Sequence, residues 1–186
     1  MEADWEIEIA PEAPVIDASW PGFIDLKLTP ERIDEIEEAR RFPGLADVLL
    51  SLNKNGSPAW TAKCDIWRAD PVSDLWDRDE MEAAFAEFTA GVACYIDILP
   101  TDPQLFEELK AIEAWARATV SRMRQSASRC SRVDLVIRRA FHAEKPGFAV
   151  TAYALACGCD ENASEKALTA ALNALARAVM AKEQSA

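Results

Sequence analysis

The chain has 186 residues, half of them hydrophobic, which is enough to bury the core of one domain without disulfides or metals. Its 20 basic and 32 acidic side chains give a net charge of −12, which repels phosphates and anionic lipids, so we expect no nucleic-acid and no membrane partner. Because the chain has neither a long apolar run nor a basic and apolar leader, we expect a cytoplasmic protein.

Residues 1–22 predict an N-terminal arm with a short edge strand. Trp5, Ile7 and Ile9 alternate with acidic residues, which is the period of a strand with one buried face. The prolines that follow this stretch disfavour a central strand. The domain proper is therefore expected to begin at residue 23.

The next segment predicts a strand followed by a helix. Residues 23–28 alternate between apolar and polar side chains. Thr29 and Pro30 then suit the N-cap and the first position of a helix. Apolar residues at helical spacing continue, with one interruption, to Leu52, and residues 59–67 alternate again. These patterns predict a strand, a helix and a second strand.

The remaining elements follow the same logic. Asp102 and Asp160 stand where the N-caps of two further helices are expected, and Gly158 is expected in the turn before the last of these helices. In chain order the sequence predicts a short helix, a strand, a long helix, two strands of a hairpin and a C-terminal helix, at residues 79–88, 92–99, 103–124, 132–141, 148–156 and 161–182.

Two phrases of the chain resemble each other. Residues 23–26, Phe-Ile-Asp-Leu, and residues 95–98, Tyr-Ile-Asp-Ile, each precede a helix start. Within a single domain of residues 23–186, this likeness predicts an internal duplication of residues 23–69 and 95–141; chance similarity of short alternating segments is the alternative. We expect an α+β fold, an antiparallel sheet of four to five strands with three main helices, in the ferredoxin-like β-α-β-β-α-β order plus a C-terminal β-α extension.

One face of this sheet is the expected place for a function. If helices cover the other face, alternate strand residues gather here as aromatic side chains beside charges of both signs. Such a surface suits a protein footprint, a homodimer seam or a ligand groove. The alternative is an ordinary solvated face with weak cross-strand ion pairs. The candidate binding residues are Lys63, Asp65, Trp67, Tyr95, Asp97, Asp134, Arg138 and Tyr153.

Four aspartates bear on metal-dependent catalysis. Asp25, Asp65, Asp97 and Asp134 lie near the centres of predicted strands. Carboxylates that converge can hold Mg²⁺ for phosphoryl transfer, but no glycine-rich phosphate loop accompanies these residues. These aspartates occupy equivalent positions in the repeated segments, so the repeat accounts for their presence without a catalytic role. We therefore predict no catalytic residue among them.

Cysteine and histidine chemistry has little support in the sequence. Cys157 and Cys159 lack the second pair that a structural zinc site needs, and Cys130 and His142 are distant candidates to complete it. His142, the only histidine, lies in a predicted turn, and the chain has no nucleophile elbow. We expect no metal ligand and no cofactor.

These expectations favour a non-enzymatic module that binds another protein or a second copy of itself. Size, acidity and element order are like those of secretion chaperones and of immunity proteins, which is an analogy at the level of fold class only. The alternative is a small-ligand binder or a metal-dependent enzyme that uses the aspartate and aromatic face of the sheet.

Overall fold

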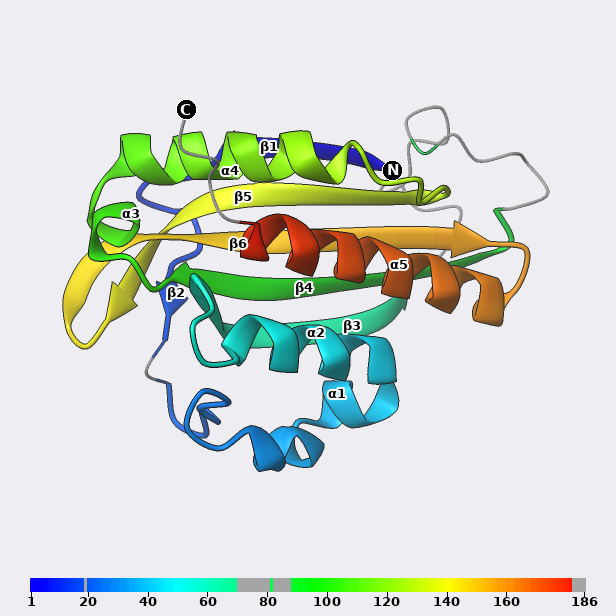
Figure 1. The fold of residues 1–186 in the computed structure, drawn as a ribbon, viewed down its shortest axis with the longest axis horizontal. Coiled ribbons are helices and arrows are strands. Elements are labelled where there is room, and N and C mark those ends of the chain that lie inside the picture. The colour runs from blue at the N-terminus through cyan, green and yellow to red at the C-terminus, as the bar shows by residue number, and fades with distance from the viewer. Residues whose placement is uncertain (19, 70–80, 82–87, 182–186) are drawn as a thin grey trace.

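The alternating segments of the chain form one six-stranded sheet with helices on one of its faces in the computed structural model (Figure 1). The structure describes residues 1–18, 20–69, 81 and 88–181. The strands are β1 (Glu2–Ile7), β2 (Ile16–Asp17), β3 (Ala59–Ala69), β4 (Ala90–Pro100), β5 (Ser131–His142) and β6 (Lys145–Gly158). The fold is therefore α+β, as the sequence predicts.

The sheet is mixed, whereas the sequence predicts an antiparallel one. Its order is β1-β5-β6-β4-β3, and β2 pairs with the far end of β5. Strands β3, β4, β6 and β5 pair antiparallel, but β1 and β2 run parallel to β5. The residue pattern of a strand reveals its buried face and not its partner, so the parallel pairing of the N-terminal arm could not be read from the sequence.

Residues 23–28 form no strand, so the strand predicted there is wrong, and residues 26–28 form a turn. The side chain of Asp25 accepts hydrogen bonds from the backbone amides of Lys27 (2.9 Å) and Leu28 (3.3 Å), and Thr29 donates its hydroxyl to the Asp25 carbonyl (2.8 Å). Such local bonds compete with a sheet ladder. The strand order β1-β5-β6-β4-β3 does not confirm the predicted ferredoxin-like order, and residues 23–26 differ in conformation from residues 95–98 in β4. The duplication itself stays a prediction.

The helices begin where the cap signals indicate. Asp102 accepts a hydrogen bond from the Gln104 amide (2.9 Å), and Asp160 accepts one from the Ala163 amide (2.7 Å). The helix expected from Pro30 begins as a 3-10 turn, and the predicted helix over 79–88 lies outside the described residues except for its positions 81 and 88. The helical elements are η1 (Pro30–Glu35), α1 (Glu37–Arg41), α2 (Pro43–Asn53), α3 (Pro103–Glu107), α4 (Leu109–Met123) and α5 (Glu161–Met180).

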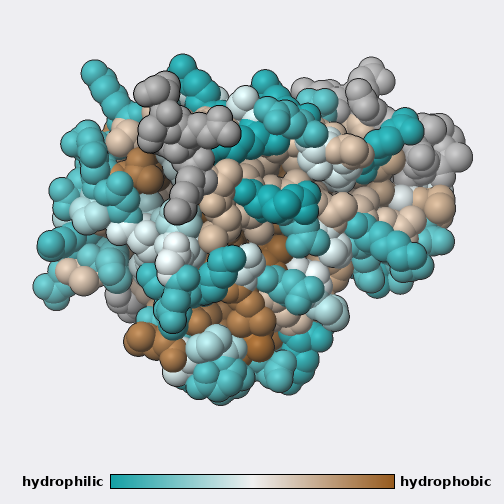
Figure 2. Space-filling model, in the orientation of Figure 1, coloured by the Kyte–Doolittle hydropathy of each residue, from teal (hydrophilic) through white to brown (hydrophobic). Residues whose placement is uncertain are grey.

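The main core lies between the sheet and helices α2, α4 and α5, which cover the face turned toward the viewer in Figure 1. Its largest side chains are almost fully excluded from solvent, among them Leu45, Leu49, Ile96, Ile112, Leu135, Ile137, Leu168 and Leu172. The outer side of this layer carries many hydrophilic residues, and an apolar area lies between α2 and η1 (Figure 2). Among the described residues, no helix is long and apolar enough to cross a membrane.

The opposite face of the sheet, here called the open face, is covered by apolar side chains near its two ends. At one end Ile16 and Ala18 of the arm pack with Trp60 and Leu99. At the other end Met81 and Phe88 join a buried group that also holds Ala69, Ala93 and Cys157. The centre of the open face lies between these two groups.

Candidate binding face

Strand pairing places most of the predicted site residues in rows across the open face. One row runs from β3 to β1 as Asp65, Tyr95, Tyr153, Asp134 and Asp4, each paired with the next. Trp67 lies in the neighbouring row on one side, and Asp97 lies in the row on the other. The structure therefore gathers the aromatic and charged residues that the alternation of the strands assigns to this face.

Three aromatic rings follow one another at the centre of the open face. The ring centroids of Trp67 and Tyr95 are 6.4 Å apart, and those of Tyr95 and Tyr153 are 6.1 Å apart. The planes are inclined by 54° and 50°, as in tilted aromatic pairs. All three side chains are half-buried, so one side of each remains available. They form a continuous aromatic run over β3, β4 and β6.

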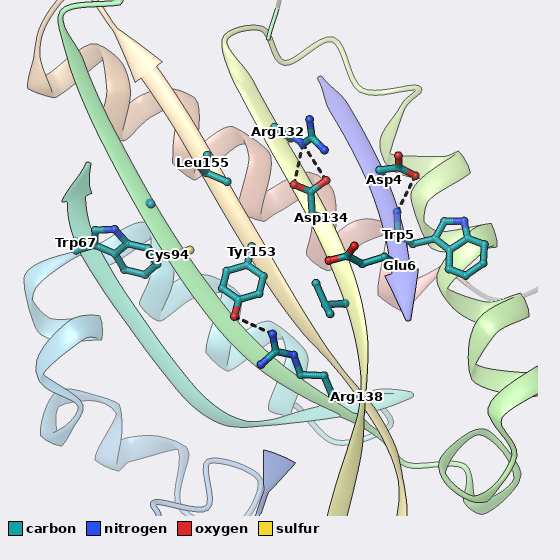
Figure 3. A pocket seen from close by; sticks show the side chains of 12 residues that line it. Asp4, Trp5, Glu6, Trp67, Cys94, Arg132, Asp134, Arg138, Tyr153 and Leu155 are labelled. Atoms are coloured by element: carbon teal, nitrogen blue, oxygen red, sulfur yellow. Dashed lines mark hydrogen bonds and ion pairs between the residues drawn. The ribbon is translucent and has the colours of Figure 1, made fainter. Parts of the chain in front are cut away.

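A hollow of about 440 Å³ lies beside this run, within the size range of small-molecule sites. In Figure 3 the side chains of Trp67 and Tyr153 border it, while the ring of Trp5 points away toward α4. Buried Ala93 and Val136, with half-buried Leu155, supply apolar surface. Charged side chains complete the lining: Asp4, Glu6, Arg132, Asp134 and Arg138.

The two arginines of this hollow are already paired within the chain. Arg132 contacts Asp134 at 2.7 Å, and Arg138 contacts Glu8 of the arm at 2.6 Å. Arg138 also donates a hydrogen bond to the Tyr153 hydroxyl (3.3 Å), and its guanidinium lies 5.7 Å from the centroid of that ring. The β5 side of the open face is thus neutralised by its own residues.

Asp97 is the least exposed acid of the face, at 7 %. The Thr151 hydroxyl donates a hydrogen bond of 2.6 Å to it. Burial raises the pKa of Asp97, against the opposing effects of that bond and of the positive charges of Arg138 and Lys63. Neither cation forms an ion pair with Asp97 in the described structure, so this carboxylate has no direct cationic partner there.

Asp97→Asn is expected to stabilise the fold at pH 7, on the order of 1 kcal/mol, because it removes a buried charge and keeps an acceptor for Thr151. Since the folded protein holds the Asp97 proton more tightly than the unfolded chain, wild-type stability should fall as pH rises through the raised pKa and stay lower above it. Urea unfolding across a pH series measures both effects.

The control for this prediction is Asp65→Asn, which removes an exposed carboxylate from the same face and should change stability by less than about 0.5 kcal/mol. A variant Asp97→Asn that is less stable than wild type at pH 7, or that gains the same amount at every pH, contradicts the prediction.

Lys63 lies at a second hollow, of about 460 Å³, between the arm and β3. The pairing of β3 with β4 shifts register between Thr61 and Cys64, so the ladder of this edge strand is irregular at Lys63. The Lys63 ammonium lies 5.6 Å from the centroid of the Trp20 ring. Tyr95 lines this second hollow, whereas Trp67 and Tyr153 line the first. Burial raises the pKa of the Cys64 thiol there to about 12, so it stays protonated.

The structure does not bring the four aspartates together. Asp25 closes a turn before η1, while Asp65, Asp97 and Asp134 lie on three different strands. No group of three or more potential metal-binding side chains occurs in the described residues. The exposed ring of His142 packs edge-on against Trp60, with centroids 4.9 Å apart, and therefore lies beside the apolar group of Ile16, Ala18 and Leu99.

Three acids of the N-terminal segment complete the open face and were assigned to the arm by the sequence. Asp4 and Glu6 line the first hollow, and Glu8 pairs with Arg138. Their alternation with Trp5 and Ile7 signals that they share one face of a strand, but nothing in that pattern names β5 as its neighbour.

No family model, no curated protein and no solved structure matches this chain.

Proposed function

We propose that this protein is a non-enzymatic binding module that engages another protein through the open face. The observation that carries the proposal is the aromatic run of Trp67, Tyr95 and Tyr153, half-exposed at the centre of the face. Interfaces concentrate binding energy in such central aromatic anchors, while charged residues surround them. Apolar surface beside the run and the charges around it fit this pattern.

The charge of the face favours a different protein over a second copy of this chain. Acidic side chains outnumber basic ones there, and the chain as a whole carries a net charge of −12. Two copies placed face to face would bring like charges together, which costs free energy unless cations intervene. We therefore place a homodimer second. Such a module acts by binding to its partner and covering part of its surface, as chaperone-like or immunity-like proteins do.

The test compares three immobilised proteins as baits for proteins of the native host. These are the wild type, the pair Tyr95→Ala with Tyr153→Ala, and the control Phe141→Ala, which removes an exposed aromatic from the hairpin end of β5. We expect one protein to be retained by the wild type and the control and lost by the pair, because two anchors are gone. Equal retention by all three contradicts the proposal.

Light scattering of the same variants decides between the two kinds of partner. A wild-type dimer that becomes a monomer in the Tyr95 and Tyr153 pair would make the partner a second copy. A wild-type monomer together with selective capture supports a different protein. Thermal unfolding of each variant shows that lost capture does not reflect lost folding.

The second candidate is a small-ligand binder or metal-dependent enzyme on the same face. The volume of the first hollow, about 440 Å³, favours the ligand binder. Native mass spectrometry of the purified protein tests it, because a retained small molecule that Arg138→Ala releases would place the ligand against that hollow.

A further inference from the structure

We propose that the open face contains a seat for an arginine side chain from a basic segment of the partner protein. The seat consists of the rings of Trp67 and Tyr95 and the carboxylates of Asp65 and Asp97. This inference rests on the proposed function, since it names the chemistry that the open face recognises.

Three aromatic rings of the described structure have a cation of the chain over them, and the two rings of the seat do not. Elsewhere, Arg138 lies over Tyr153, Lys63 over Trp20 and Arg117 over Trp5, at 5.7, 5.6 and 5.3 Å. In the described structure, no lysine or arginine lies over Trp67 or Tyr95, although the two rings contact each other. A cation over such a pair is favoured by the negative faces of both rings.

The two carboxylates flank Tyr95 and have no ion-paired cation among the described residues. Asp65 pairs with Tyr95 in the ladder, and Asp97 follows it two residues later on the same face of β4. The exposed Asp65 side chain accepts only the Ile66 amide (2.7 Å), and Asp97 accepts only the Thr151 hydroxyl, among the residues described. A positive side chain placed here would offset the free-energy cost of burying the Asp97 charge and would form charge-assisted hydrogen bonds.

The neighbouring half of the face shows the same chemistry with a cation already present. There Tyr153 has the Arg138 guanidinium over its ring, and Glu8 neutralises that arginine at 2.6 Å. The seat at Trp67 and Tyr95 repeats this combination of ring and carboxylate without the guanidinium. Arginine suits it better than lysine, because a planar guanidinium can stack on a ring while it binds carboxylates at its edge.

Charge complementarity also fixes the character of the surrounding segment. The net charge of −12 attracts a basic chain and accelerates its encounter, an effect that salt screens. Along the row, Asp65 lies on the β3 side of the aromatic run, whereas Asp134 and Asp4 on the other side are already paired with Arg132 and Arg124. The basic stretch of the partner is therefore expected over the β3 and β4 side of the open face.

Nuclear magnetic resonance titration of the full, ¹⁵N-labelled chain tests the seat with defined probes. The probes are glycine–serine peptides of equal length that carry arginine, lysine or glutamate. We expect the arginine peptide to shift the amide signals of Asp65, Trp67, Tyr95 and Asp97 and the indole N–H of Trp67. The lysine peptide should shift them less, and the glutamate peptide should leave them unchanged at the same salt concentration.

Matched variants separate the seat from general attraction to an acidic protein. Asp65→Asn and Asp47→Asn each remove one exposed carboxylate, the first from the seat and the second from α2. Only Asp65→Asn should weaken arginine-peptide binding clearly. Tyr95→Leu should weaken it about 2- to 30-fold, the range that cation–π energies give. Equal effects of the two asparagine variants, or shifts spread over the helices, overturn the inference.

The outcome also distinguishes the seat from the function on which it rests. If the arginine peptide does not shift the signals of the seat but the double variant Tyr95→Ala with Tyr153→Ala still loses partner capture, only the arginine seat is wrong. If capture survives in that pair, the open face is not the binding surface, and the proposed function fails.

Discussion

Replacing Leu135 with alanine is expected to lower the free energy of unfolding by about 2–5 kcal/mol. Leu135 lies at the centre of β5, is fully excluded from solvent and belongs to the core beneath the helices. Its removal leaves a cavity between the sheet and the helical layer that close-packed neighbours fill only in part. Urea unfolding measures the change as a lower midpoint with an unaltered slope.

Leu155→Ala is the matched control for this prediction, because it is the same substitution on the other face of the sheet. Leu155 is half-buried beside the first hollow, so its truncation should cost about 1 kcal/mol. Equal losses for the two variants would contradict the view that the helix-covered face carries the main core.

Elements with local signals could be predicted from the sequence. The alternation of apolar and polar residues predicted the positions of β3, β4, β5 and β6 in the chain and the face on which each side chain lies. This works because successive side chains of a strand point to opposite faces of the sheet. Asp102 and Asp160 marked helix starts because a cap acts within three residues of itself. Each of these features depends only on neighbours in the chain.

The failure at residues 23–28 shows where local signals stop. This segment alternates like residues 95–98, yet only the latter form a strand. A strand needs a partner, and residues 95–98 lie between β3 and β6, whereas Asp25 satisfies nearby amides within its own turn. The choice between the two outcomes is made by tertiary context.

The site shows the same division between local and distant information. The face of Trp67, Tyr95 and Tyr153 followed from alternation, but their order across the sheet required the strand pairing. The ion pair of Arg138 with Glu8 joins residues 130 apart in the chain, so no spacing rule could predict it. Likewise, the residue pattern does not reveal the register shift of β3 between Thr61 and Cys64, where Lys63 lies.

Asp97 connects the stability of the fold with the proposed function. Its burial with no ion-paired cation among the described residues costs stability, and the same carboxylate belongs to the proposed arginine seat. Asp97→Asn should therefore have opposite effects on stability and on binding. It should raise the free energy of unfolding and weaken binding of the arginine peptide. A residue with only a structural role would not be expected to combine these two effects.

Gly158→Val is expected to destabilise the protein by about 1–3 kcal/mol, the usual cost of forcing extra atoms into packed structure. The sequence places this glycine in a turn, but it ends β6, and its importance lies in a close approach of two backbones. A Cβ here would lie 2.5 Å from the Ser164 amide nitrogen and 2.8 Å from the Ala163 carbonyl carbon. These backbone atoms belong to the start of α5, so the helix or the strand must move.

That movement should reach the open face as well as the helix. The Gly158 carbonyl accepts the Thr89 amide (3.1 Å), which leads into β4, and the preceding Cys157 packs with Ala93 at the edge of the first hollow. Hydrogen exchange should therefore quicken in α5 and at the start of β4 together. Gly56→Ala provides the contrast: its φ of +80° adds strain of about 1 kcal/mol, but no atom lies near the new Cβ, so α5 should keep its protection. Wild-type exchange in α5 of Gly158→Val would show that the close approach does not hold the helix on the sheet.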